Sequence, residues 1–543
     1  MVFGSITYAH AKSLVGGLST SGDPGYPPDV PWMALAILEG GRSVAVSCST
    51  LLQNGLYWAT EPGASRNRLV VGTDPGSVAK QLFQVSLNVD HLFKSALLEP
   101  STATPFREIH RLRLGQTLLF DTLGGPTRIL DWCGPSHWSN VDAPDVGHVR
   151  EYVEAFDRVV ADSLTRTQEV VVCASSGLDS TYLLASLARR LGGSEVAHGY
   201  VHAPLPGARL RRPDGTAADE YPLASLMESR YPSRVRIRAV RNFDSVKPLD
   251  AALQLSSLSW EPMLAVSNAI WISQIWDIAC RHDSKFLYHG RHGNASFSGP
   301  HPYALDYYLA NRRPAAALRV SFQRPHALRT WLSASRNHLG FGGRPAAKIQ
   351  TDEQCSAVRV VDGSRVGWRL DTAAYDREAF LRELGLRRSR VASLPYPRGV
   401  LPVDPFRARA ILELASRIPP IDWTRGPLGW RGYRGFARRV GKGRVPDPIR
   451  LARAGDSQGQ DAWFAMRDQK TQYLSFVEAL RDCPVFGDAI DHRHISQVVR
   501  DWPWGEAQSP PTQEFAMVNQ VLHVSQFVSL LRNEFPQLSV GGS

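Results

Sequence analysis

The chain has 543 residues, of which 43% are hydrophobic and 21% are charged, and these proportions are typical of a globular protein. One hydrophobic core rarely serves a chain of this length, so two or three domains are expected. No apolar run is long enough to span a bilayer, and the first residues lack the apolar core of a secretory signal. These features argue against a membrane-spanning or secreted protein, and we expect a cytoplasmic one.

Basic residues outnumber acidic ones, 62 against 51, which gives a net charge of +11. A surplus of this kind suits nucleic acid, an acidic surface or a polyanionic small molecule as a partner. The six cysteines are scattered, without the C-x-x-C spacing of metal or redox sites.

The N-terminal part, residues 1–145, is predicted to be rich in β-structure. Short β-branched and apolar runs alternate there with glycine, proline and polar turns, as in VPWMALAILEGG, SVAVSCSTLL, LYWATEPG and RLVVGTDPGS.

The rest of the chain, residues 146–543, has a different pattern. An amphipathic helix is expected at 148–166, and apolar strands then alternate with helical segments up to Gly290. This alternation predicts a parallel sheet with helices on both faces.

Ligands of parallel α/β sheets bind at the carboxyl ends of the strands, so loops after Cys173, His202, Val240 and Gly290 should form the site. The first of these loops joins a buried strand to a helix, and a helix N-terminus presents N–H groups that suit phosphate oxygens. Its candidate phosphate-binding residues are Ser175, Ser176, Gly177, Leu178, Asp179, Ser180 and Thr181.

Asp179 is the unusual member of this loop, because a carboxylate facing phosphate would repel it. A bridging Mg²⁺ removes this conflict, since hard cations bind carboxylate and phosphate oxygens together. The alternative interpretation is a serine-rich turn in which Asp179 acts as a local helix cap.

The segment Ala174–Thr181, ASSGLDST, resembles the SGGxDS pyrophosphate loop of N-type ATP pyrophosphatases and, by its LDS, the asparagine synthetase superfamily. Ser176 stands where the usual pattern has its second glycine. A second segment, Gly290–Ser298 (GRHGNASFS), resembles the G-x-G-G-N-x-x-x-S element of lasso peptide cyclases. The resemblance implies cofactor-binding roles for Gly290 and Gly293. It also implies catalytic roles for Asp179 and Arg291, and Mg²⁺ ligation by Asp179 and Asn294. His292 and His202 are candidates for a catalytic base by residue type and loop position.

The N-terminal part carries a third resemblance. Thr104–Phe120 is similar to the segment that closes the glutaminase domain of asparagine synthetases. A glutaminase of this type needs a cysteine directly after the initiator methionine, and position 2 is Val2 here. We therefore expect a glutaminase-like β-rich sandwich that lacks glutaminase activity, so that the attacking nitrogen is not ammonia from glutamine.

The C-terminal part adds a basic segment between Arg425 and Arg453, in which Asp447 is the only acidic residue. It is interpreted either as a solvated basic face or as a wall facing ATP or pyrophosphate, and the phosphate loop favours the second. Overlapping its end, Val445–Asp461 resembles a stretch of asparagine synthetase-like cyclases. Asparagine and β-lactam synthetases use a lysine in this loop to stabilise charged states, and no lysine occurs between Gly443 and Asp468. Arg450 or Arg453 is therefore expected to replace it, or the role has moved to Lys442.

Together these resemblances imply a fold with an inactive glutaminase-like sandwich followed by a parallel-sheet ATP pyrophosphatase domain with a helical C-terminal part. They imply an AMP-forming ligase with ATP and Mg²⁺ as cofactors. It would activate an Asp or Glu side chain of a leader-free core peptide and close it on the N-terminal amine. A leader peptidase and a leader-recognition protein are the implied partners, and nucleic acid is not.

Three alternatives stay open. A β-lactam synthetase-like enzyme would close a small amino acid, but the tyrosine of that family is Arg291 here and the loop lysine is missing. An enzyme that adenylates a tRNA base would suit the positive charge, but paired cysteines for sulfur transfer are absent. A protein that binds ATP without catalysing a reaction is the third alternative. It is suggested by Ser176, Asn294 and Val2, which depart from the patterns of the catalytic families.

Overall fold

The computed structural model describes residues 33–38, 43–48, 56–61, 67–98, 101, 103–112, 116–121, 127–131, 147–164, 169–206, 208, 219–242, 246–264, 266–282, 284–298, 400–418, 423, 434–452, 461–504 and 513–539. Val2 and Arg453, to which the sequence assigns roles, lie outside these ranges. No helix within these ranges is long and apolar enough to cross a bilayer.

The centre of the molecule is a five-stranded sheet with the strand order β11-β10-β9-β12-β13, and every neighbouring pair is parallel. The predicted mixed α/β architecture with a parallel sheet is therefore confirmed. Residues Val171 and Val172 are 0% exposed, as expected for a central strand that is covered on both faces. The strands are β9 (Glu169–Ala174), β10 (Val196–His202), β11 (Val235–Val240), β12 (Phe286–His289) and β13 (Leu401–Val403).

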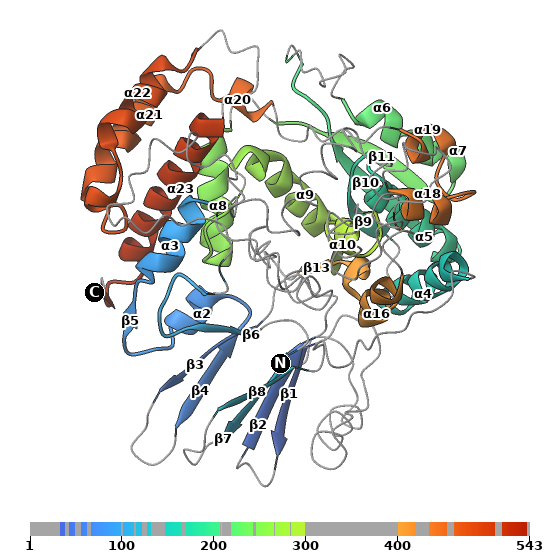
Figure 1. The fold of residues 1–543 in the computed structure, drawn as a ribbon, viewed down its shortest axis with the longest axis horizontal. Helices are drawn as coiled ribbons and strands as arrows, with labels where there is room; N and C mark the ends of the chain where they lie inside the picture. The colour runs from blue at the N-terminus through green and yellow to red at the C-terminus, as the bar shows by residue number, and fades with distance from the viewer. Residues whose placement is uncertain are drawn as a thin grey trace, which may run out of the picture.

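Helices cover both faces of this sheet (Figure 1). Alternate residues of β9 therefore belong to two different hydrophobic cores, one on each face. Val170 and Val172 pack with α4, α5, α16 and α18, whereas Val171 packs with α8 and α9. Phe156 and Val160 of α4 are fully buried, and each such side chain contributes roughly 1.5–3 kcal/mol of apolar burial. The bounds are α4 (His148–Ser163), α5 (Leu178–Arg190), α16 (Arg409–Arg417), α18 (Gly435–Val440), α8 (Pro248–Ser259) and α9 (Ala269–Arg281).

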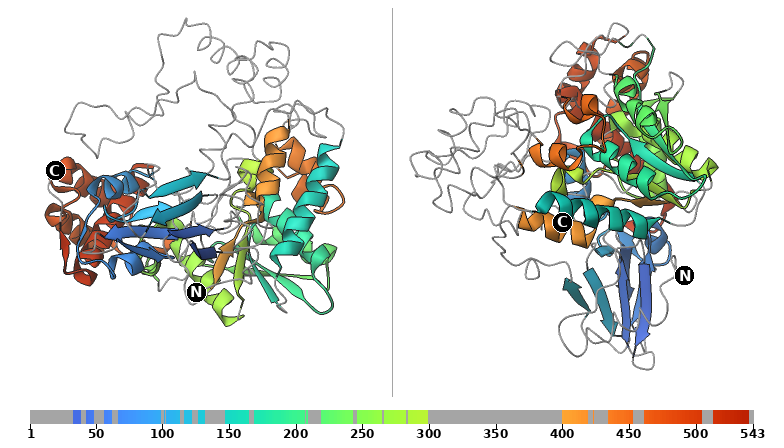
Figure 2. Two further views of the ribbon diagram at one scale, coloured as in Figure 1. Left: turned by 90° about the horizontal axis from the view of Figure 1, so that it is seen from below. Right: turned by 90° about the vertical axis from the view of Figure 1, so that its right-hand side faces the viewer.

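The N-terminal part forms two antiparallel sheets, with strand orders β1-β2-β7-β8 and β4-β3-β6, as the alternation of short apolar runs and turns predicts. Val46 and Leu118 of the first sheet pack against Leu56, Trp58 and Leu112 of the second. Figure 2 shows these strands projecting from the rest of the molecule. The elements are β1 (Met33–Leu38), β2 (Ser43–Cys48), β3 (Leu56–Glu61), β4 (Arg68–Gly72), α2 (Pro75–Ala79), β5 (Val85–Ser86), α3 (Val89–Ala96), β6 (His110–Leu112), β7 (Gln116–Asp121) and β8 (Arg128–Asp131).

The C-terminal part is helical, as predicted, and it packs against the N-terminal part. Strand β14 pairs in parallel with β5, and the ring of Phe535 lies 5.2 Å from that of Phe106. One continuous core therefore joins residues on both sides of the predicted boundary at 145/146. The remaining elements are α6 (Tyr221–Ala224), α7 (Leu226–Arg230), η3 (Val266–Asn268), α10 (Gly293–Ser296), η7 (Pro405–Arg407), α19 (Asp447–Arg450), α20 (Ala462–Ala465), α21 (Lys470–Ala479), η9 (Leu480–Asp482), η10 (Gly487–Ala489), α22 (His492–Asp501), α23 (Gln513–Glu534) and β14 (Leu538–Ser539).

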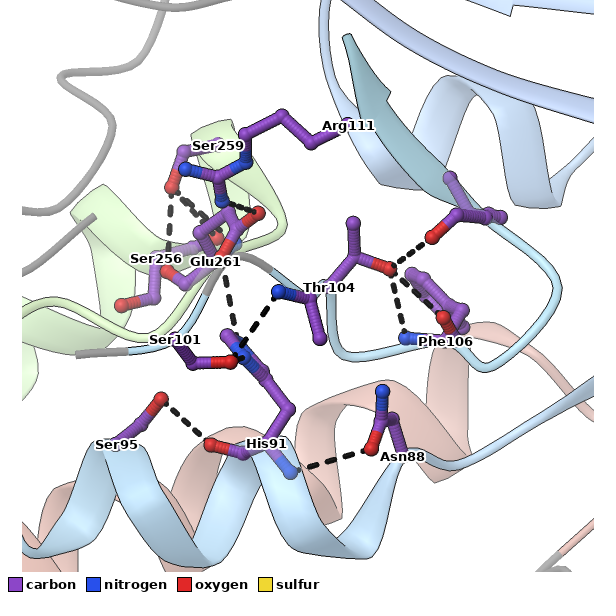
Figure 3. Close-up of polar contacts among 12 residues, drawn as sticks. Asn88, His91, Ser95, Ser101, Thr104, Phe106, Arg111, Ser256, Ser259 and Glu261 are labelled. Carbon is purple, nitrogen blue, oxygen red and sulfur yellow. Dashed lines mark hydrogen bonds and ion pairs between the residues drawn. The ribbon is translucent and has the colours of Figure 1, made fainter. Parts of the chain in front are cut away.

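A buried ion pair ties the N-terminal sheets to the loop after α8 (Figure 3). Arg111 of β6 donates from Nη2 to Glu261 Oε1 at 2.5 Å, and its guanidinium lies 5.3 Å from the ring of Tyr57. His91 Nε2 lies 3.6 Å from the other carboxylate oxygen. Burial alone would raise the pKa of Glu261, but the Arg111 charge and the contact with His91 outweigh it and lower that pKa. The carboxylate therefore stays charged inside the protein.

Candidate active site

The site predicted from the sequence lies where the strand order of the parallel sheet reverses. The chain runs from β9 to β10 and β11 on one side, and then returns to place β12 on the other side of β9. At such a point the loops after the two neighbouring strands diverge and leave a crevice at their carboxyl ends. These are the loop Ser175–Gly177 and the loop that begins at Gly290. The structure therefore brings both predicted motifs to one edge of the sheet.

The loop after β9 is braced by its own hydroxyl groups. Ser180 Oγ accepts the N–H of Ser175 at 3.0 Å and lies 2.8 Å from Ser175 Oγ, which in turn accepts the N–H of Gly177 at 3.1 Å. Thr181 Oγ1 donates to the carbonyl of Gly177 at 2.8 Å. These hydroxyls are thus engaged within the loop, and they fix its shape.

Amide groups in the first turn of helix α5 are the feature of this loop that could bind phosphate. Gly177 is the N-cap residue and supplies no side-chain cap, so the first turn keeps the N–H groups that an α-helix leaves without helical partners. The partial positive charge of the helix N-terminus lies at the same place. A Cβ on Gly177 would come within 3.0 Å of Ser175 Oγ, so glycine keeps this turn tight.

Glu220, which precedes α6, also contacts the loop and was not identified from the sequence. Its Oε2 accepts the N–H of Ser176 at 3.3 Å, and the side chain is buried. A carboxylate beside a phosphate loop poses the same electrostatic conflict as Asp179. Nothing in the local pattern around residue 220 signals this contact, which joins positions 44 residues apart.

Asp179 lies against the loop after β12. A Cβ on Gly290 would lie 3.2 Å from the backbone carbon of Asp179, and a Cβ on Gly293 would overlap its side chain. Gly293 therefore leaves no room for a methyl group, and Gly290 allows a close approach of the two loops. This contact brings the cofactor-binding candidates Gly290 and Gly293 together with Asp179, as the sequence predicts.

Arg291 provides a partly buried positive charge at the same edge. Its Nη1 is buried without a hydrogen-bond partner among the described residues. Burial lowers the pKa of Arg291, and the nearby Cys173 and Asp404 only partly oppose this. A buried charge is costly unless it is paired, so this guanidinium suits an anionic ligand.

His292 is held by Asp404, a second residue that sequence reasoning missed. Asp404 follows β13, is completely buried and accepts the backbone N–H of His292 at 3.0 Å. The same carboxylate oxygen is hydrogen-bonded to His292 Nδ1. A carboxylate on Nδ1 fixes the neutral tautomer with the lone pair on Nε2, as a general base requires. Asp404 also accepts the N–H of Phe406 at 3.1 Å and so begins η7.

Asn294 is placed beside the basic segment. Its Oδ1 accepts from Ser298 Oγ at 3.1 Å and from Arg434 Nη2 at 3.3 Å. An oxygen that faces a guanidinium does not fit Mg²⁺ ligation in this conformation. The residue predicted as a second metal ligand therefore serves here to connect α10 with Arg434.

Arg450 has a different set of partners from those expected of a charge-stabilising residue. It pairs with Asp447 at 2.8 Å, and its Nη1 donates to the carbonyl of Arg438 at 3.1 Å. Arg438 donates in return to the carbonyl of Arg450 at 2.7 Å. Arg444 forms a bidentate pair with Asp157, at 2.6 and 2.8 Å. Much of the basic segment is thus fastened to the protein, and Arg453 lies outside the described residues.

His202, a base candidate by its position after β10, is also buried. Its Nε2 lies 2.9 Å from Asp461 Oδ1, which accepts from Asn242 Nδ2 at 2.7 Å as well. Asp461 Oδ2 accepts the N–H of Leu205 at 2.9 Å. This cluster fastens the segment that begins at Asp461 to the sheet edge. It leaves His292 as the more suitable base.

The residues present fit a nucleotide with its metal in part. The first turn of α5 and the partly buried Arg291 can bind phosphate oxygens, and Asp179 can supply a carboxylate to Mg²⁺. Magnesium is commonly held by one or two carboxylates, with phosphate oxygens and water completing its shell. Asn294 does not add to this set in the conformation observed. No protein-family model and no curated protein sequence matches this chain.

Proposed function

We propose that the chain is an ATP-dependent, AMP-forming amide ligase of the asparagine synthetase type, which closes the macrolactam ring of a lasso peptide. The carboxylate of an Asp or Glu side chain attacks the α-phosphorus of ATP and releases pyrophosphate. The N-terminal amine of the same peptide then attacks the acyl-adenylate and loses a proton, and AMP departs. The net change in the peptide is the loss of one water.

The observation that carries this proposal is the contact of Asp179 with Gly290 and Gly293 at the point where the strand order reverses. It joins the candidate phosphate loop and the second motif into one surface. The first turn of α5 binds the phosphates that become pyrophosphate, and Arg291 offsets negative charge that develops there. Asp179 would hold Mg²⁺, and the ion would supply further charge neutralisation.

His292, oriented by Asp404, accepts the proton of the attacking amine. General-base catalysis of this kind contributes roughly 10²–10⁴-fold to the rate. Holding the activated carboxyl group and the amine in the same peptide replaces a bimolecular encounter with an intramolecular one. In this proposal the N-terminal sheets perform no glutaminase chemistry, and the amine comes from the substrate.

The test uses the full chain, ATP, Mg²⁺ and synthetic leader-free peptides with an acidic residue near the ring-closing position. We expect pyrophosphate release and a peptide product lighter by one water, without added glutamine. The Asp179→Ala variant should lose both while its circular dichroism is unchanged. Asp162→Ala, at an exposed aspartate of α4, is the matched control and should behave as wild type.

Two results would contradict the proposal. If Asp179→Ala released pyrophosphate at the wild-type rate, this carboxylate would not be a ligand of an essential metal ion. If the product formed only with added glutamine, the attacking amine would not come from the peptide substrate. Closure of a small β-amino acid, with no peptide accepted, would instead identify the β-lactam alternative.

A further inference from the structure

A second group of potential ligands lies at the opposite edge of the parallel sheet, near the amino ends of the strands. Glu169 is the first residue of β9, His198 lies in β10, and His282 directly follows α9. Each residue offers one ligand atom, and these three atoms all lie within 4.8 Å of one another. The group thus joins two strands and the end of a helix.

The individual distances suit a shared cation. His198 Nε2 lies 3.6 Å from Glu169 Oε1, and His282 Nδ1 is hydrogen-bonded to Glu169 Oε2. An ion with bonds of about 2.0–2.2 Å to nitrogen and oxygen can bridge ligand atoms up to roughly 4 Å apart. Small side-chain rotations therefore suffice to bring all three atoms onto one ion. The rings of His198 and His282 are 4.9 Å apart and tilted by 39°, so they are not stacked flat on each other.

Tyr200 supplies the outer contact that metal-binding histidines usually have. Its hydroxyl lies 2.8 Å from His282 Nε2. A histidine that binds a metal through one ring nitrogen generally donates the other N–H to an oxygen, which fixes the tautomer. In this structure the hydrogen bond to Glu169 places a proton on Nδ1, and Nε2 faces the Tyr200 hydroxyl. When a metal ion takes the place of that proton, Nε2–H donates to the Tyr200 oxygen and Nδ1 offers its lone pair to the ion.

Access to the group is open. The side chains of Glu169, His198 and His282 are 44%, 16% and 22% exposed, so an ion can enter and a water can complete its shell. Arg238 and Arg236 of the adjacent strand β11 both bring positive charge near His198. Arg236 Nη1 donates to the carbonyls of Pro232 and Val235, which holds the charge of this side chain in contacts with the backbone.

We propose that Glu169, His198 and His282 form a site for one Zn²⁺ ion, with water as the fourth ligand. Two imidazoles and one carboxylate are a ligand set that suits zinc, and harder ions such as Mg²⁺ prefer oxygen ligands. The ion fastens the end of α9 to β9 and β10. The site is separate from the candidate active site, because β9 presents Glu169 at one end and the phosphate loop at the other.

The test measures metal binding by the full chain after removal of metals with a chelator. Titration with Zn²⁺ followed by calorimetry should show one equivalent that is lost in Glu169→Gln and in His198→Ala. Co²⁺ should give the visible absorption of a four-coordinate site in the wild type and not in these variants. Tyr200→Phe keeps the buried ring but lacks the hydroxyl, and should bind Zn²⁺ about 10–100-fold more weakly.

His494→Ala is the matched control, since His494 Nε2 forms a pair with Glu514 at 2.6 Å. It should bind zinc as the wild type does. The site is refuted if Glu169→Gln and His198→Ala, folded by circular dichroism, bind zinc with the same stoichiometry and affinity as the His494→Ala control. If the wild type bound no zinc, Glu169 and His282 would form an ion pair and not a metal site, and this result would also overturn the proposal.

Discussion

A Cβ on Gly293 would lie 2.3 Å from Cγ of Asp179 and 2.6 Å from its Oδ1, so these two residues are packed without room for a methyl group. Asp179 belongs to the first turn of α5, and Gly293 begins α10. The contact therefore fixes the distance between the two loops of the candidate active site.

Gly293→Ala should displace the Asp179 carboxylate and lower ATP-dependent pyrophosphate release by about 100-fold, because a 1 Å misplacement in an active site can cost this much. The matched control is Gly192→Ala, where the added Cβ would meet only Glu195 Oε2, at 3.7 Å. Steady-state kinetics on both variants measure the effect. If Gly293→Ala keeps the wild-type rate, the placement of Asp179 does not limit the reaction.

The pairing of His292 with Asp404 gives a second prediction. His292→Ala should lower the rate of ring closure by roughly 10²–10⁴-fold if the imidazole is the base. Because pyrophosphate release precedes attack by the amine, exchange of labelled pyrophosphate into ATP should persist in this variant. Loss of exchange together with ring closure would assign His292 to the first step or to the fold.

Asp404→Asn tests how the carboxylate acts through His292. Without the negative charge the protonated imidazole is less stable, so the acidic limb of the pH–rate profile should move to lower pH. A purely structural role would lower the amount of folded protein and leave the position of that limb unchanged. Pre-steady-state measurements over a range of pH distinguish the two.

The sequence predicted the features that depend on local pattern. The β-branched run at Val170–Val172 became the buried strand β9, and the loop after it opens a helix as expected. The alternation of strands and helices likewise predicted the parallel sheet. These features follow from spacing within a few residues, which a single sequence displays.

Contacts between distant segments could not be predicted in this way. Asp404 reaches His292 across 112 residues, and Glu220 reaches Ser176 across 44 residues. Arg450 was expected to replace the missing loop lysine, but its Nη1 donates to the carbonyl of Arg438 across 12 residues. Such pairings depend on which segments the fold brings together, and periodicity does not carry that information.

The buried pair of Arg111 and Glu261 predicts a loss of stability when one partner is removed. Glu261→Gln should lower the free energy of unfolding by about 3–5 kcal/mol, because it leaves Arg111 charged and uncompensated inside the protein. The pKa of Glu261 is lowered from 4.5 in the folded chain, so its contribution is present above that value and is lost as pH falls through the lowered pKa. Urea unfolding at several pH values should show this acid-induced loss in the wild type but not in the variant. Lys94→Gln, which breaks the exposed pair with Asp90, is the control and should change stability by less than about 1 kcal/mol.

His523 on α23 predicts a separate loss of stability at mildly acidic pH. Its Nε2 accepts the N–H of Met263 at 3.1 Å, and burial lowers its pKa from 6.5 to about 3. Between these values the unfolded chain binds a proton that the folded chain does not. The contribution is therefore complete above pH 6.5 and falls by up to about 1.4 kcal/mol per pH unit as the pH is lowered toward 3.

His523→Gln keeps a hydrogen-bond acceptor but cannot bind this proton. Its unfolding free energy should depend less steeply on pH between 6 and 4 than that of the wild type, by about 1.4 kcal/mol per unit. His494→Gln removes a partly exposed histidine and is the control, for which the steep dependence should persist. Equal slopes for His523→Gln and the wild type would show that His523 is protonated in the folded protein at these pH values, contrary to its burial against Ser256 and Met263.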